Sequence, residues 1–116
     1  MAIPTPGQPV RGSRTGKPVM ALLDLLGRRW LARIIWELND GPQTFRALRT
    51  RCDEMSPTVL NQRLGELREA SLVEIAPDGG YTLTNSGRAL LKAMMPLMAW
   101  AGEWEQELEQ LQQAVS

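Results

Sequence analysis

Two helix start signals separated by a short turn constrain this chain more than any other feature of its sequence. The stretch TFRALRTRC opens with Thr44 as a helix N-cap and places Phe45 and Leu48 on one side. The turn CDEM follows, and Ser56 and Pro57 then supply the cap and the first-turn proline of a second helix. Two helices joined by so short a turn predict a helix-turn-helix arrangement.

The second helix, over residues 56–70, has a polar outer face. At 100° per residue Leu64 and Leu67 fall within about 40° of Leu60, so these three leucines share one side of the helix and face the core. The opposite side and its flank carry amide and hydroxyl groups and a glycine, namely Thr58, Asn61, Gln62 and Gly65. Such groups match base edges in the major groove, and a glycine leaves room for close approach. We therefore predict that these four residues read DNA bases.

Other residues of the same two helices are candidates for contact with the DNA backbone. Hydroxyl caps and basic side chains can hold phosphates without reading sequence, and the candidates are Thr44, Arg46, Arg49, Arg51, Ser56, Arg63 and Arg68. We expect the first three of these arginines to lie largely on the outside. Arg28 and Arg29 are further candidates, and Glu66 and Glu69 are expected where the helix leaves the groove. For any single arginine, a solvated surface position is the alternative.

The remaining segments predict a mainly α chain with a small β-hairpin. Residues 1–16 are rich in proline and glycine and are expected to form a flexible N-terminal tail, followed by one domain over residues 17–116. Helices are expected from Pro18 to near Gly27 and over the stretch RRWLARIIWEL. The strands LVEIA and YTL flank the turn PDGG, and a long final helix follows with a bend around Pro96.

The final helix carries an apolar stripe that we interpret as a dimerisation seam. Its members step by three and four residues, as in a coiled coil, and are Met94, Leu97, Ala101, Trp104, Leu108 and Leu111. A domain of this size has little left to pack against so long a stripe. We therefore expect a homodimer, with Leu22 of the first helix contributing to the interface. The alternative is a helix that folds back on its own core.

Composition excludes several other classes of function. The chain has no histidine and a single cysteine, Cys52, so no metal site, cofactor site or enzyme active site is expected. No run of about 18 apolar residues and no signal peptide are present, which predicts a cytoplasmic protein without a membrane partner. The net charge is zero, but residues 1–70 carry four excess positive charges and residues 71–116 four excess negative charges. The basic half can attract phosphates.

Three stretches resemble the HxlR-type winged helix-turn-helix transcriptional regulators, over about residues 17–104. They are LLDLLGRRW, GPQTFRALRTRCDEMSPTVLNQRLGELREASLVE and YTLTNSGRALL. The resemblance implies a dimeric bacterial regulator of double-stranded DNA, with the helix over residues 56–70 in the major groove and the hairpin as a wing. Many members carry a cysteine where this chain has Lys17, so thiol sensing at that position is not implied. The wing is also short and contains Asp78.

Two hypotheses follow from these patterns. The first is a sequence-specific DNA-binding transcriptional regulator that acts as a homodimer. The second is a winged-helix module for protein–protein interaction that no longer binds DNA, which the zero net charge and the short wing suggest. The sequence leaves room for a small-molecule effector but gives no support for one. Absence of binding to genomic DNA fragments at low salt, together with co-purification of a protein partner, would favour the second hypothesis.

Overall fold

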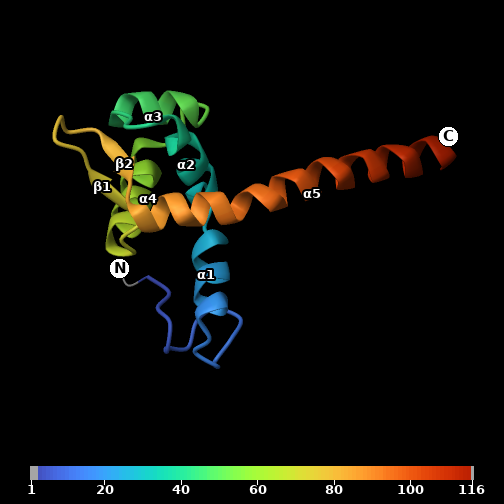
Figure 1. Cartoon of the computed structure of the whole chain (residues 1–116), viewed down its shortest axis with the longest axis horizontal. Helices are drawn as coiled ribbons and strands as arrows, with labels where there is room; N and C mark the ends of the chain where they lie inside the picture. The colour runs from blue at the N-terminus through green and yellow to red at the C-terminus, as the bar shows by residue number, and fades with distance from the viewer. Residues whose placement is uncertain (1–2, 116) are drawn as a thin grey trace.

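The computed structural model describes residues 3–115 as a winged helix-turn-helix with a long C-terminal helix (Figure 1). This confirms the mainly α fold with one hairpin. In chain order the elements are α1 (Pro18–Leu26), α2 (Leu31–Glu37), the 3-10 helix η1 (Leu38–Asp40), α3 (Phe45–Arg51), α4 (Pro57–Glu69), β1 (Val73–Ile75), β2 (Tyr81–Leu83) and α5 (Asn85–Val115). Residues 1, 2 and 116 of the predicted tail and domain lie outside the described residues.

Local hydrogen bonds at the helix starts explain why the elements begin where they do. The hydroxyl of Thr44 accepts a bond from the backbone N–H of Ala47 at 3.0 Å, and Ser56 accepts one from Val59 at 3.3 Å. Both residues are therefore N-caps, as the sequence predicts. Thr84 plays the same part before α5, since its Oγ1 accepts from the N–H of Gly87 at 3.0 Å.

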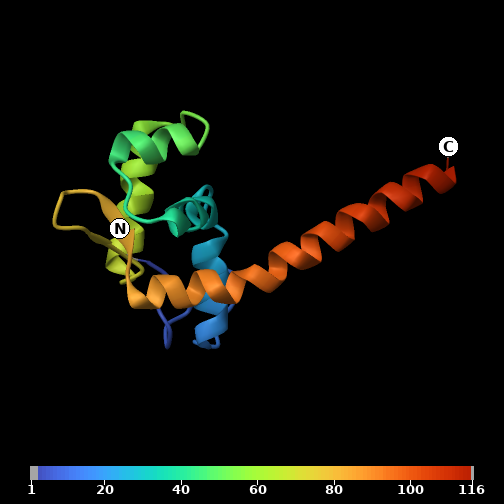
Figure 2. The same cartoon turned by 45° about the horizontal axis from the view of Figure 1, so that its top comes forward.

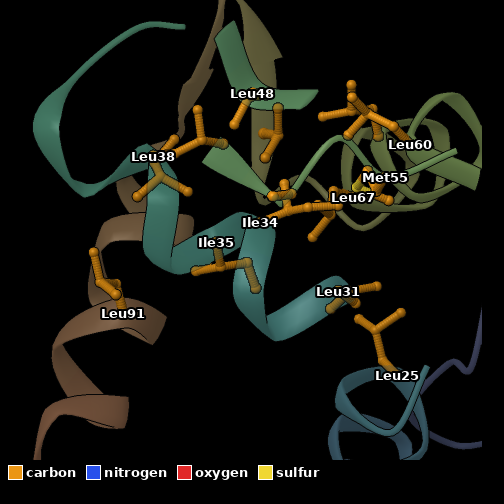
Figure 3. Close-up of a cluster of buried hydrophobic side chains, with 14 residues drawn as sticks. Leu25, Leu31, Ile34, Ile35, Leu38, Leu48, Met55, Leu60, Leu67 and Leu91 are labelled. Atoms are coloured by element: carbon orange, nitrogen blue, oxygen red, sulfur yellow. The ribbon is translucent and has the colours of Figure 1, made fainter. Parts of the chain in front are cut away.

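Helix α2 lies at the centre of the hydrophobic core (Figure 3). Its residues Leu31, Ile34 and Ile35 are fully buried. Leu25 of α1 and Leu91 of α5 approach α2 from different sides, whereas other buried leucines come from the helix-turn-helix, namely Leu48, Leu60, Leu64 and Leu67. The core thus fastens α3 and α4 to the rest of the chain by their inner faces.

The hairpin is short and is tied to the segment before α3. Its two antiparallel strands pair Val73 with Leu83 and Ile75 with Tyr81. Tyr81 also forms a bridge with Gln43, through two backbone hydrogen bonds of 2.7 and 2.9 Å. In the turn, the carboxylate of Asp78 accepts a bond from the N–H of Gly80 at 3.0 Å. The acid that we noted in the wing therefore stabilises the turn itself.

The N-terminal segment forms a loop that lies against α1. The N–H of Gly7 donates to the carbonyl of Gly16 at 2.7 Å and closes the loop. The N–H of Arg11 donates to the carboxylate of Asp24 in α1 at 3.1 Å, and Ile3 packs against the core. The predicted tail is thus an ordered loop in this structure over residues 3–16, and its flexibility stays a prediction.

Helix α5 leaves the body of the molecule and extends far beyond it (Figures 1 and 2). The helix is continuous through Pro96, and its axis changes direction in its orange part, in agreement with the predicted bend. The radius of gyration is 16.4 Å, compared with about 13 Å for a compact chain of this length. Within residues 3–115, no helix combines the length and apolar character that crossing a bilayer requires.

Candidate nucleic-acid interface

The outer face of α4 presents all four residues that we expect to read bases. Thr58, Asn61, Gln62 and Gly65 are exposed, whereas Leu60, Leu64 and Leu67 on the other side are buried. A Cβ atom added at Gly65 would meet nothing within 4 Å. The glycine therefore opens the outer face and serves no close contact inside the protein. The helix orientation agrees with the sequence, and the reading of bases stays a prediction.

Two of the predicted phosphate-contacting arginines point to solvent. Arg46 in α3 and Arg68 in α4 are exposed, and neither forms an ion pair with another described residue. The capping residues Thr44 and Ser56 are also exposed, although their hydroxyls already accept backbone hydrogen bonds within the protein. The exposed arginines thus have side chains available for phosphate.

Arg49 differs from the expectation because it holds the turn of the helix-turn-helix together. Its Nε donates to the carbonyl of Met55 at 2.8 Å, and its guanidinium lies 3.4 Å from the carboxylate of Glu54. Asp53 and Glu54 have φ of 58° and 56°, in the left-handed region that costs energy for residues other than glycine. The arginine therefore braces a turn that the backbone alone does not favour.

Arg51 is likewise bound within the protein. Its Nη1 donates to the carbonyl of Glu37 at 3.3 Å and to the carboxylate of Asp40 at 3.0 Å. The side chains of Arg49 and Arg51 are each 37% exposed, so both lie only partly on the outside. The expectation of largely external arginines thus holds for Arg46 and is wrong for these two, because protein acceptors draw them inward.

Arg63 and Glu66 lie on the inner flank of α4, and Glu66 pairs with both Arg63 and Arg28. The Glu66 side chain is only 4% exposed, and its carboxylate accepts from the guanidinium of Arg28 and, at 2.7 Å, from that of Arg63. Arg63 is 15% exposed and also donates through Nε to the carbonyl of Arg29 at 2.7 Å. The expected positions of Glu66 at the groove exit and of Arg63 on the DNA backbone do not match this burial.

Burial also governs the ionisation of two groups in this region. Loss of solvent lowers the pKa of the Arg63 guanidinium, and the positive charge of Arg28 lowers it further. Burial raises the pKa of the Cys52 thiol, because the thiolate would lose its hydration. Cys52 is fully buried at the end of α3. Within residues 3–115, no cluster of three or more Cys, Asp or Glu could hold a metal ion.

The predicted dimerisation stripe is exposed along the outer part of α5. Leu97 is 64% exposed, and Ala101, Trp104, Leu108 and Leu111 are exposed as well, whereas Met94 and Leu22 are partly buried. The sequence interpretation missed Trp100, which stacks on Trp104 with ring centroids 5.6 Å apart. It also missed Val19 and Leu23 on the exposed side of α1. Trp100 was detectable, since it lies one helical turn before Trp104.

Comparisons with known proteins agree with this architecture. A family model described as HxlR-like helix-turn-helix matches residues 25–109. The HTH-type transcriptional regulator YodB of Bacillus subtilis is 36% identical over 86 residues, which cover 69% of this chain and 77% of that protein. The HTH-type transcriptional regulator YvaP, described as uncharacterized and from the same organism, is 33% identical over 88 residues, covering 71% and 82%.

Solved structures of transcriptional regulators are also similar to this chain. The chain is similar to quinone-bound YodB of B. subtilis with a TM-score of 0.68 and 37% identity, over 74% of this chain and 97% of that one. It is also similar to a protein described as a possible HxlR family transcriptional factor of Thermoplasma volcanium GSS1. That match has a TM-score of 0.67 and 29% identity, over 78% of this chain and 86% of the other.

Proposed function

The chain belongs to the HxlR-like helix-turn-helix family and is a DNA-binding transcriptional regulator, and we propose that it acts as a homodimer that reads DNA with α4. In this proposal α4 of each subunit enters the major groove of one half-site. Its residues Thr58, Asn61 and Gln62 contact base edges, and Gly65 permits close approach. The protein would act in the cytoplasm, where the DNA is.

The observation that carries this proposal is the division of α4 into two faces. The three leucines of the inner face are buried in the core, so the body holds the helix firmly. The outer face carries only polar side chains and a glycine with open space around it. A helix supported in this way can enter a groove without unfolding any part of the core.

The backbone contacts are proposed for a smaller set than the sequence suggested. Arg46 and Arg68 are exposed without ion pairs among the described residues, so their guanidinium groups can neutralise phosphates. Thr44 and Ser56 mark the N-termini of α3 and α4, where backbone N–H groups favour an anion. We propose no phosphate contact for three of the predicted arginines, because their guanidinium groups already donate to carbonyl or carboxylate oxygens of the protein. These are Arg49, Arg51 and Arg63.

The dimer is proposed from the exposed stripe of α5. An isolated chain would leave Leu97, Trp104, Leu108 and Leu111 in water, and exposed apolar patches of this kind mark interaction surfaces. A second copy offers the same stripe, so that a two-fold interface can bury both. Val19 and Leu23 of α1 are also exposed apolar residues and are proposed to join this interface. Two α4 helices would then face half-sites about 34 Å apart.

Binding measurements on captured DNA test this function. Genomic fragments retained by the purified protein are sequenced, and affinity for the enriched site is measured against salt concentration. Gln62→Ala should lose about 1–3 kcal/mol on this site and relax its sequence preference. Arg46→Gln should weaken binding to all sequences alike and reduce the salt slope by about one. Arg88→Gln, which removes an exposed arginine of α5, serves as the matched control.

The outcomes separate this proposal from its alternative. If Gln62→Ala and Arg46→Gln both bind like the parent protein, the assigned roles of α4 and α3 are wrong. If the parent retains no genomic fragment even at low salt and a protein partner co-purifies with it, the interaction-module hypothesis replaces the proposal. The zero net charge and the short wing are the observations behind that alternative, and the family and its relatives give it no support.

A further inference from the structure

A buried ion cluster joins α4 to the turn between α1 and α2. Among the described residues, Glu66 is the one charged residue that is buried, with 4% of its surface exposed. Arg28 comes to it from the turn, 38 residues away in sequence, and Arg63 comes from one turn earlier on α4. Every buried polar side-chain atom in the described part of the chain has a hydrogen-bond partner. The cluster is therefore complete.

The cluster reaches the backbone of the α1–α2 turn as well. Arg63 donates to the carbonyl of Arg29 at 2.7 Å, directly before Trp30. Trp30 has a φ of 74°, a left-handed conformation that is uncommon for a residue with a large side chain. A side chain of α4 thus holds the residue next to this unusual backbone position. The same three side chains therefore link the turn to α4.

We propose that Arg28, Arg63 and Glu66 are positioning residues that set the direction of α4 relative to α1, and thereby the half-site spacing that the dimer accepts. This inference rests on the proposed function. In that proposed function the exposed apolar residues Val19 and Leu23 of α1 belong to the dimer interface, whereas the outer face of α4 meets the DNA. The cluster connects α4 with the turn that directly follows α1.

We expect such a cluster to fix the orientation of α4 more than to raise the stability of the fold. Replacing a buried ion group by apolar side chains of similar volume often leaves stability unchanged or raises it. Charge-assisted bonds from a planar guanidinium, however, have fixed directions, and leucine contacts permit small slides and rotations. Because half-sites lie about 34 Å apart, a small rotation of each α4 shifts the base contacts of both.

The test measures binding to a series of duplexes. Each duplex carries two copies of the half-site captured by the parent protein, and the spacing between them changes one base pair at a time. The parent should prefer one spacing over its neighbours by about tenfold or more. In Glu66→Gln the preference should shrink to about threefold or move to another spacing. Glu69→Gln is the matched control, since Glu69 is an exposed acid on the same helix, and it should keep the parent profile.

A second variant separates positioning from folding. The triple change Arg28→Met, Arg63→Met and Glu66→Leu removes all charges of the cluster together and should fold with a melting temperature close to that of the parent. We expect it to bind DNA with a broadened spacing profile. If it keeps the sharp profile of the parent, or if Glu66→Gln keeps it, the inference is wrong while the proposed function stands. If the parent itself captures no DNA, the proposed function fails first.

Discussion

The two parts of α5 follow one helical pattern but have different surroundings. In the first part, Gly87 and Leu91 are buried against the body, and Leu91 packs into the core beside α2 (Figure 3). From Leu97 onward, the apolar side chains other than the half-buried Met98 face solvent along a helix that extends away from the other elements (Figure 1). We call residues 97–115 the arm and residues 18–94 the body.

This contrast shows how far a helical repeat of apolar residues can predict burial. The period predicts that one face of a helix will be buried, but it does not say by which chain. The body buries most of its apolar side chains within one chain, because α2 lies between the other helices, and Val19 and Leu23 of α1 are exceptions. The arm has no such neighbour among the described elements, and we proposed above that its stripe packs against a second copy. If body and arm differ in this way, matched substitutions in the two parts should have different effects.

The largest effect is expected from a charge placed in the seam of the arm. Leu108→Glu puts a carboxylate into the apolar stripe, beside Glu107 and Glu109. Burying these charges in an interface is costly, so the variant should sediment as a monomer. Loss of the second half-site contact should weaken binding to the captured site by about 10²–10⁴-fold. Gln106→Glu adds the same charge on the far side of the helix and should remain dimeric. A dimeric Leu108→Glu would contradict the proposed seam.

The next effect compares a leucine of the body with a leucine of the arm. Leu64 is 1% exposed, and Leu64→Ala should lower the free energy of unfolding by about 2–5 kcal/mol because it leaves a cavity. Leu111 is 58% exposed, and Leu111→Ala should change the stability of the monomer by less than about 0.5 kcal/mol. Urea titrations followed by circular dichroism, in the Leu108→Glu background, measure both. Equal losses would remove the distinction between body and arm.

A smaller effect compares two glycines of α5. A Cβ at Gly87 would overlap the carbonyl oxygen of Leu72, so Gly87→Ala should cost about 1–3 kcal/mol. A Cβ at Gly102 in the arm would meet nothing within 4 Å, and Gly102→Ala should raise helix stability by up to about 1 kcal/mol. Thermal melts in the monomeric background should therefore shift in opposite directions. A stabilising Gly87→Ala would show that α5 does not pack closely on the strand region.

The smallest effect concerns Cys52 in the body. Because burial raises the pKa of its thiol, the thiol stays protonated in the folded protein where the unfolded chain would already ionise. Its contribution to stability is therefore complete below the ordinary thiol pKa and is lost as the pH rises through the folded value. Near neutral pH, a thiol reagent should label Cys52 only as fast as the protein unfolds, and urea should make labelling complete. Fast labelling of the folded protein would contradict this burial.

Local signals predicted most of the fold. Thr44 and Ser56 begin their helices as expected because an N-cap acts on the next three residues. The inner and outer faces of α4 also follow from its period alone. The glycine-rich turn and the strands around it were likewise predictable from neighbouring residues.

The part of the site that escaped prediction depends on contacts between distant residues. Arg49 and Arg51 carry charge that could serve phosphate or protein, and only the fold brings Met55 and Glu37 to them. Glu66 meets Arg28 across 38 residues, which no local pattern shows. One signal was available, since Arg63 lies only about 60° from Leu60 on a helical wheel and therefore near the core.

The measurement that tests the central claim most directly is site-directed cleavage of DNA from the outer face of α4. Cys52 is the only cysteine and is buried, so Asn61→Cys introduces a single accessible thiol to which an iron chelate can be attached. On the captured site, this probe should cut in two clusters related by two-fold symmetry, with centres about 34 Å apart. A single cluster, or intact DNA under conditions in which the labelled protein binds, would contradict the account.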